Sequence, residues 1–156
     1  MLAAAAAGAA GSPRGTARAV IGGATVEIDY GRPWVRGRDL LQWIEPGQLW
    51  RLGADAPTTI QSTARLGFGG MLAPPGKHIL LVRYIAPGAW SLVISSRPAI
   101  EYVPAARIAE ALAHFDQRKD PVEQFTIQIL ALNHHGAIDI AWGRYRLSVP
   151  FSIANR

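Results

Sequence analysis

A chain of 156 residues is long enough for one domain with one hydrophobic core, and its composition, 49% hydrophobic and 17% charged, excludes a disordered class. The net charge of +5 raises the question of nucleic acid, but the basic residues are scattered outside the stretch from Arg32 to Arg51 and no nucleic-acid-binding motif occurs, which argues against that partner. Cysteine is absent, which excludes disulfides and thiolate chemistry, and no apolar stretch approaches the roughly 20 residues of a membrane-spanning helix.

The chain starts with an alanine-rich segment, MLAAAAAGAAGSP. This composition is typical of the apolar centre and cleavage region of a secretory signal without its charged beginning, which a misplaced start codon would explain. The alternative is an Ala/Gly-rich tail that has no large side chain to bury. We therefore predict a disordered leader or signal-peptide remnant over residues 1–16, without fixed structure to about Ala17, and a single domain over residues 17–156.

The rest of the chain is predicted to form short strands separated by Gly and Pro. The segment Thr25–Tyr30 alternates strictly between polar and apolar residues, as a half-buried strand does. Gly69-Gly70 and Pro87-Gly88 lie where tight hairpins are expected. Five further segments are rich in Ile, Val, Leu and aromatic residues, which favour strands: Lys77–Ile85, Ala89–Ser95, Gln124–Leu132, Ala137–Trp142 and Tyr145–Ile153.

One segment has a helical rather than a strand-like pattern. Ala105–Arg118 places Ile108, Leu112 and Phe115 at helical spacing and contains alanines and a glutamate, so it is predicted to be a short helix. Many short strands with turns between them indicate an all-β fold. We expect an antiparallel β-sandwich or jelly roll of about eight to ten strands with at most one short helix.

Arginine and tryptophan are concentrated between Tyr30 and Thr59. A guanidinium suits carboxylate, phosphate or sulfate, and the four arginines of this stretch can converge on an anionic ligand: Arg32, Arg36, Arg38 and Arg51. The alternative is that they pair with carboxylates and hold a long loop against the sandwich. The carboxylates available for such pairs are Glu27, Asp29, Asp39, Asp55 and Glu123.

The tryptophans of the same stretch offer flat faces on which sugar rings can stack. These are Trp34, Trp43 and Trp50, and of the three it is Trp34, in a loop between Pro33 and Val35, that we expect to be exposed. Trp50 precedes a charged residue in an apolar–polar alternation, which also fits a position in or beside the core. Trp90 and Trp142 lie inside predicted strands and are expected in the core.

Catalytic and metal sites have weaker support. Asp55, Thr58 and Thr59 follow a Gly-Ala turn, where such side chains commonly close turns on the backbone. A catalytic pair would need Asp29 or Glu123 to approach Asp55 in space. The histidines show no ligand spacing, and no phosphate-binding glycine motif occurs, so we expect no metal and no cofactor.

Several short motifs in one order resemble the family called domain of unknown function 2911. They are Ile28–Pro33, Arg36–Arg38, Trp50–Asp55, Thr58-Thr59, Ala73–Gly76, Trp90, Val122–Thr126, Trp142 and Val149-Pro150, so the resemblance covers roughly residues 12–153. Members are mostly bacterial and often exported, which implies a periplasmic or secreted location, with the cytoplasm as alternative. The family usually has asparagine and glutamate where this chain has Asp55 and Ala56. The resemblance implies no activity.

These observations favour an exported β-sandwich that binds a small anion or an acidic saccharide. The alternatives are a hydrolase-like enzyme that uses a carboxylate pair around Asp55, and a structural or envelope interaction domain without a ligand. Of these, the sequence favours a non-enzyme, and it leaves the oligomeric state open. The candidate ligand-binding residues are Tyr30, Arg32, Trp34, Arg36, Arg38, Trp50, Arg51, Asp55, Thr58, Thr59 and Glu123.

Overall fold

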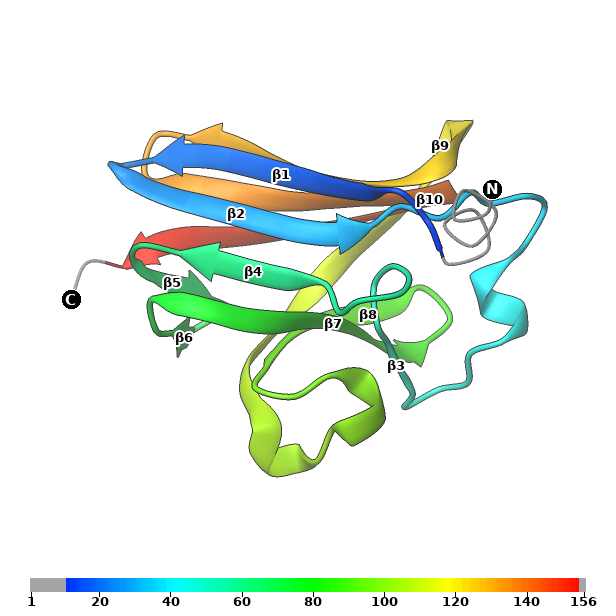
Figure 1. Ribbon diagram of the computed structural model, residues 1–156, viewed down its shortest axis with the longest axis horizontal. Coiled ribbons are helices and arrows are strands. Elements are labelled where there is room, and N and C mark those ends of the chain that lie inside the picture. The colour runs from blue at the N-terminus through cyan, green and yellow to red at the C-terminus, as the bar shows by residue number, and fades with distance from the viewer. Residues whose placement is uncertain (1–10, 155–156) are drawn as a thin grey trace, which may run out of the picture.

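The computed structural model describes residues 11–154, and its regular structure consists of antiparallel strands and short 3-10 turns (Figure 1). The strands are β1 (Arg14–Ile21), β2 (Ala24–Gly31), β3 (Leu49–Trp50), β4 (Thr59–Ser62), β5 (Arg65–Phe68), β6 (Met71–Ala73), β7 (Gly76–Ala86), β8 (Ala89–Ser95), β9 (Arg107–Leu132) and β10 (His135–Ala154). Their order is β1-β2-β4-β7-β8-β9-β10-β5-β6, and β3 pairs with β7. The predicted all-β class is confirmed.

The long strand β9 joins the two halves of this sheet. Its first residues pair with β8, as in Trp90 with Ala113, whereas the stretch from His114 onward pairs with β10. In Figure 1, β9 runs from the layer of β7 and β8 up to the layer of β1, β2 and β10. The sheet therefore folds over on itself, and its inward side chains form one core that includes Val26, Leu80, Leu92, Phe125 and Ile138.

The two hairpins predicted from glycine turns are confirmed, because β5 pairs with β6 and β7 pairs with β8 across them. The two segments predicted as Ala137–Trp142 and Tyr145–Ile153 belong to one strand, β10. The pairing of β10 with β9 is irregular around Gly143, whose φ is +58°. The sequence pattern breaks at this bulge, although the strand continues through it.

The prediction of a short helix over Ala105–Arg118 is wrong. A single 3-10 turn, η3 (Pro104–Ala106), precedes β9, and residues 11–154 contain no α-helix. Two further 3-10 turns are η1 (Leu40–Gln42) and η2 (Ala99–Glu101). Pairing with β8 overrides the helical spacing, because Ala109 faces the core while Leu112, one of the three residues at helical spacing, is 75% exposed.

The domain also begins earlier than predicted. β1 starts at Arg14 and pairs with β2 from Arg14–Gly31 to Ile21–Ala24, so residues 14–17 form a strand instead of a disordered leader. Backbone pairing requires no large side chains, which explains why an alanine- and glycine-rich composition concealed this strand. In the remainder of the predicted leader, residues 11–13 have no regular secondary structure, and residues 1–10 lie outside the described residues.

A segment between β8 and β9 covers the outward face of the sheet. Leu81 and Val93 point away from the main core cluster and are nevertheless buried. The chain from Ser96 to Ala106 closes over them, with a hydrogen bond from Ser96 N to Ala106 O of 2.9 Å at its base. This excursion, which contains η2 and η3, forms the lower lobe in Figure 1. Most of its residues are exposed or half-buried, and Ala106 is buried.

Candidate functional site

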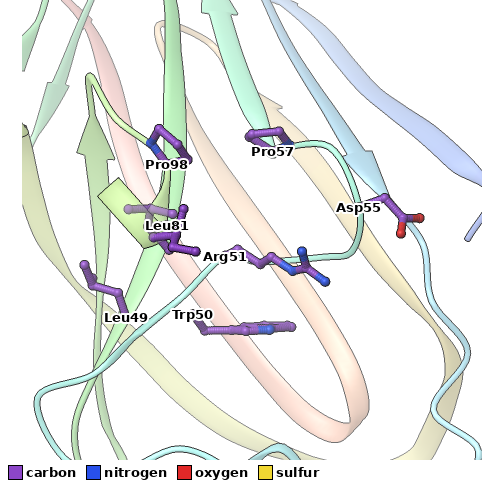
Figure 2. A pocket seen from close by; sticks show the side chains of 9 residues that line it. Leu49, Trp50, Arg51, Asp55, Pro57, Leu81 and Pro98 are labelled. Carbon is purple, nitrogen blue, oxygen red and sulfur yellow. The ribbon is translucent and has the colours of Figure 1, made fainter. Parts of the chain in front are cut away.

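The main hollow of the candidate site lies between the chain that follows β3 and the segment around η2. We call it the Arg51 hollow; its volume is about 570 Å³ (Figure 2). Its walls are predominantly apolar, as is usual for small-molecule sites. The residues that line it are Leu49, Trp50, Arg51, Asp55, Pro57, Leu81, Pro98, Ala99 and Ile100.

The loop that carries Arg51 and Asp55 is fixed by an unusual backbone. Leu52 and Asp55 have φ of +58° and +65°, and Gly53 has φ of +140°, so the chain turns sharply three times. The buried hydroxyl of Thr58 donates a hydrogen bond of 2.6 Å to Leu52 O and closes the loop. Left-handed conformations cost energy in residues other than glycine, and they persist where the surrounding structure holds them. The surrounding structure therefore holds this loop in its shape.

Arg51 is the most available charged group in the hollow. It is exposed, and within residues 11–154 its side chain makes neither a hydrogen bond nor an ion pair. Figure 2 shows its guanidinium above the ring of Trp50, on the side of the hollow where Asp55 lies. The carboxylate of Asp55 accepts a hydrogen bond of 2.7 Å from Ser12 N, which leaves further acceptor positions on both oxygens. The hollow thus offers a donor fork beside an acceptor.

A second hollow, which we call the Trp43 hollow, adjoins the first and has a volume of about 530 Å³. Its lining residues are Leu40, Trp43, Ile44, Gly47, Gln48, Leu49, Trp50, Arg83, Ala99 and Tyr102. Trp34 is exposed, at 41%, as predicted, and Trp43, at 62%, is exposed as well. Trp90 and Trp142 are buried in the core, as predicted.

Arg83 of the Trp43 hollow belongs to a network around Glu110. Glu110 receives hydrogen bonds from Arg83 at 3.0 Å, from Arg107 at 3.2 Å and from the hydroxyl of Ser91. Burial favours the protonated form of Glu110, but these donors outweigh it and hold its pKa below the usual value. The same hydrogen bond with Glu110 raises the pKa of Arg83. Arg83 and Arg107 therefore share the single carboxylate of Glu110.

Two of the predicted site residues form a structural clasp between β2 and β9. The hydroxyl of Tyr30 accepts a hydrogen bond of 2.9 Å from Ile127 N and donates one of 3.3 Å to Ile127 O. Arg32 donates to Phe125 O at 3.0 Å and to the hydroxyl of Thr126 at 3.1 Å. Both side chains make hydrogen bonds with backbone and hydroxyl groups of β9. These contacts hold the end of β2 and the residue after it against β9.

Replacing Tyr30 with phenylalanine should lower the free energy of unfolding by about 1–3 kcal/mol, because the buried N–H and C=O of Ile127 lose their partner. Tyr84→Phe is the matched control. Tyr84 is also buried, and its hydroxyl makes no hydrogen bond within the described residues, so this change should cost less than about 0.5 kcal/mol. Urea denaturation of both variants measures the difference, and equal costs would contradict the clasp.

The other predicted residues near this segment lie away from both hollows. Arg38 donates to the carbonyls of Trp34 and Val35, and its guanidinium lies 5.8 Å from the centre of the Trp142 ring. Glu123 accepts a hydrogen bond of 2.9 Å from the backbone N of Arg36. Of the four arginines, Arg51 alone lines either hollow. The structure does not bring the four guanidiniums to one point.

The carboxylates considered for catalysis have separate partners. Asp29 forms an ion pair of 2.6 Å with Arg14, and Glu123 contacts the backbone of Arg36. No described hydrogen bond or ion pair joins either of them to Asp55. Asp39 begins η1 and accepts a hydrogen bond of 2.9 Å from Tyr145; burial and this carboxylate raise the pKa of Tyr145 to about 12. Thr59 belongs to β4, where it pairs with Asp29 and Ile79.

Sequence reasoning missed the wall opposite Arg51. Pro98, Ala99 and Ile100 complete the first hollow, and Arg83 and Tyr102 complete the second. One signal was present: Ile100, 94% exposed, is an apolar residue in a Pro-bounded stretch between two strands. Within residues 11–154, no cluster of His, Cys, Asp and Glu could hold a metal ion, and no helix has the length and apolar character to cross a membrane.

Comparison with known proteins gives one match. No curated protein and no solved structure is similar to the chain. The sequence profile described as protein of unknown function (DUF2911) matches residues 12–151, which include both hollows, the clasp and the loop of Arg51. Because this match covers most of the chain, the protein belongs to the DUF2911 family of proteins of unknown function.

Proposed function

We propose that this domain binds a small acidic saccharide, such as a uronic acid, in the Arg51 hollow. The observation that carries the proposal is the exposed guanidinium of Arg51, which has no partner within the described residues and stands in a hollow of about 570 Å³. An exposed arginine on a well-held loop can bind a carboxylate through two parallel hydrogen bonds. Because the loop is already ordered, little free energy is lost in ordering it on binding.

The remainder of the hollow suits a sugar ring. The oxygens of Asp55 can accept hydrogen bonds from hydroxyl groups. Trp50 and Pro98 present apolar surface to the C–H face of a ring. Trp50 is itself held from behind by edge contacts to Phe125, with ring centres 5.3 Å apart. A planar anion such as acetate would use Arg51 alone, whereas a uronic acid would use all of these groups.

The proposal predicts that Arg51→Ala weakens the binding of glucuronic or galacturonic acid at least about ten-fold, because a charge-assisted hydrogen bond contributes about 1.5–3 kcal/mol. The stability of the free protein should change by less than about 0.5 kcal/mol, since Arg51 has no intramolecular partner among the described residues. Isothermal titration calorimetry measures the affinities, and ligand-induced shifts of the melting temperature support them.

Arg36→Ala is the matched control, because Arg36 is exposed, its side chain makes no described contact and it lies outside the hollow. Its affinity for uronic acids should equal that of the wild type. Glucose has the sugar ring without the charge, whereas phosphate and sulfate have the charge without the ring. Each should bind more weakly than the uronic acids. If no uronic acid binds, or if Arg51→Ala binds as tightly as the wild type, the proposal is wrong.

We further propose that the protein acts outside the cytoplasm. This location rests on the exported relatives that the sequence motifs imply and on the alanine-rich start of the chain. Fractionation of cells that express the protein from its native locus tests it: recovery in the cytoplasmic fraction would contradict export.

A further inference from the structure

The two hollows lie next to each other, and we call them together the groove. They share Leu49, Trp50 and Ala99 as lining residues. Leu49 and Trp50 form the short strand β3, which pairs with Arg83 and Val82 of β7. Arg51 stands at one end, and Trp43 with Tyr102 stands at the other. A ligand confined to the first hollow would leave the second one open.

The two ends of the groove differ in whether their guanidinium is already engaged. At the Arg51 end, the guanidinium has no partner among the described residues. At the Trp43 end, Arg83 is bound by Glu110 at 3.0 Å and also donates to the hydroxyl of Tyr102 at 3.3 Å. Among the described residues, the guanidinium that is open to an anionic group therefore lines the Arg51 end.

The Trp43 end nevertheless carries the groups that recognise a neutral sugar. The ring of Trp43 is 62% exposed and provides a stacking surface. The exposed Gln48 and the hydroxyl of Tyr102 line the same hollow and can exchange hydrogen bonds with hydroxyl groups. A solvent-exposed tryptophan beside an amide and a phenol matches a pyranose, which has an apolar face and a polar edge.

Building on the proposed function, we propose that the ligand is an acidic oligosaccharide of at least two rings. Its uronic acid lies in the Arg51 hollow, and a neutral sugar lies against Trp43 and Tyr102. The acid group sets the orientation of the chain in the groove, because within residues 11–154 the guanidinium without a partner lines the Arg51 end. Trp50 contacts both rings, since it lines both hollows.

The test compares glucuronic acid, a disaccharide of glucuronic acid linked to a neutral sugar, and the neutral disaccharide cellobiose by titration calorimetry. The acidic disaccharide should bind at least about ten-fold more tightly than glucuronic acid, the gain expected from one stacked ring with its hydrogen bonds. Trp43→Ala should remove this gain and leave the binding of glucuronic acid unchanged. Trp34→Ala is the control, because Trp34 is an exposed tryptophan outside the groove, and it should keep the gain.

The outcomes separate the two proposals. If glucuronic acid binds through Arg51 but the disaccharide binds no more tightly, the second ring has no site and the oligosaccharide inference is wrong, while the proposed function stands. A gain that persists in Trp43→Ala also overturns the inference. If cellobiose binds as tightly as the acidic disaccharide, the orientation by Arg51 is wrong. If none of the three ligands binds, the proposed function fails and the inference fails with it.

Discussion

The substitution Gly31→Ala is expected to destabilise the protein by about 3 kcal/mol, the upper part of the range for overpacked sites. A Cβ atom at Gly31 would overlap the carbonyl oxygen of Ala54, and it would lie only 3.0 Å from the carbonyl carbon of the same residue. Gly53, the residue before Ala54, is also close, because its own Cβ would lie 2.9 Å from Gly31 O. Both neighbours are backbone, which cannot rotate away as a side chain can.

Gly37→Ala is the reference substitution for this steric effect, because it creates no overlap. Gly37 has φ of +73° and has nothing within 4 Å of an added Cβ, so alanine there meets only the cost of a left-handed backbone, about 1 kcal/mol. Guanidinium denaturation of the two variants gives both free energies. If Gly31→Ala costs no more than Gly37→Ala, the close approach of β2 to the Arg51 loop is wrong. With that approach confirmed, Gly31→Ala should also weaken ligand binding, because Asp55 follows Ala54 directly.

Two strands were predictable from local sequence, the half-buried β2 and β8, which is buried on both faces. Thr25–Tyr30 and Ala89–Ser95 follow from alternation, composition and flanking turns, and the structure places β2 and β8 at nearly the same residues. Ala105–Arg118 was not predictable in this way. Alanine fits a helix by propensity and a crowded strand by size, and only the pairing of β9 with β8, a nonlocal contact, decides between them.

The candidate site was predictable on one side only. Trp50, Arg51 and Asp55 are close in sequence, and the structure places them in one hollow. The opposite wall, Pro98–Ile100, is brought there by β7 and β8, which no local pattern reveals. The roles of Arg32 and Arg38 were also hidden, because both bind backbone carbonyls. From the sequence, only carboxylates can be considered as partners for an arginine. Backbone carbonyl oxygens are present at every residue, so the sequence does not show which of them accept a hydrogen bond.

The network around Glu110 predicts the second large effect. Glu110→Ala removes the carboxylate that receives hydrogen bonds from Arg83, Arg107 and Ser91, and its side chain is only 15% exposed. Complete loss of one partner of a buried ion pair costs about 3–5 kcal/mol. Arg83 and Arg107 are 26% and 44% exposed, so water compensates part of this loss. We therefore expect a loss of about 2 kcal/mol at neutral pH.

The pH dependence provides an independent check of this network. The pKa of Glu110 is lowered in the folded protein, so its contribution to stability is present above the unfolded-state value of 4.5 and is lost as the pH falls through the lower folded-state value. The difference in unfolding free energy between wild type and Glu110→Ala should therefore shrink on acidification below about pH 4.5. Glu45→Ala, at an exposed glutamate whose side chain has no described contact, should show neither effect. A Glu110→Ala difference that stays constant from pH 7 to pH 3 would mean that packing, and not the ionised carboxylate, stabilises this face of the sheet.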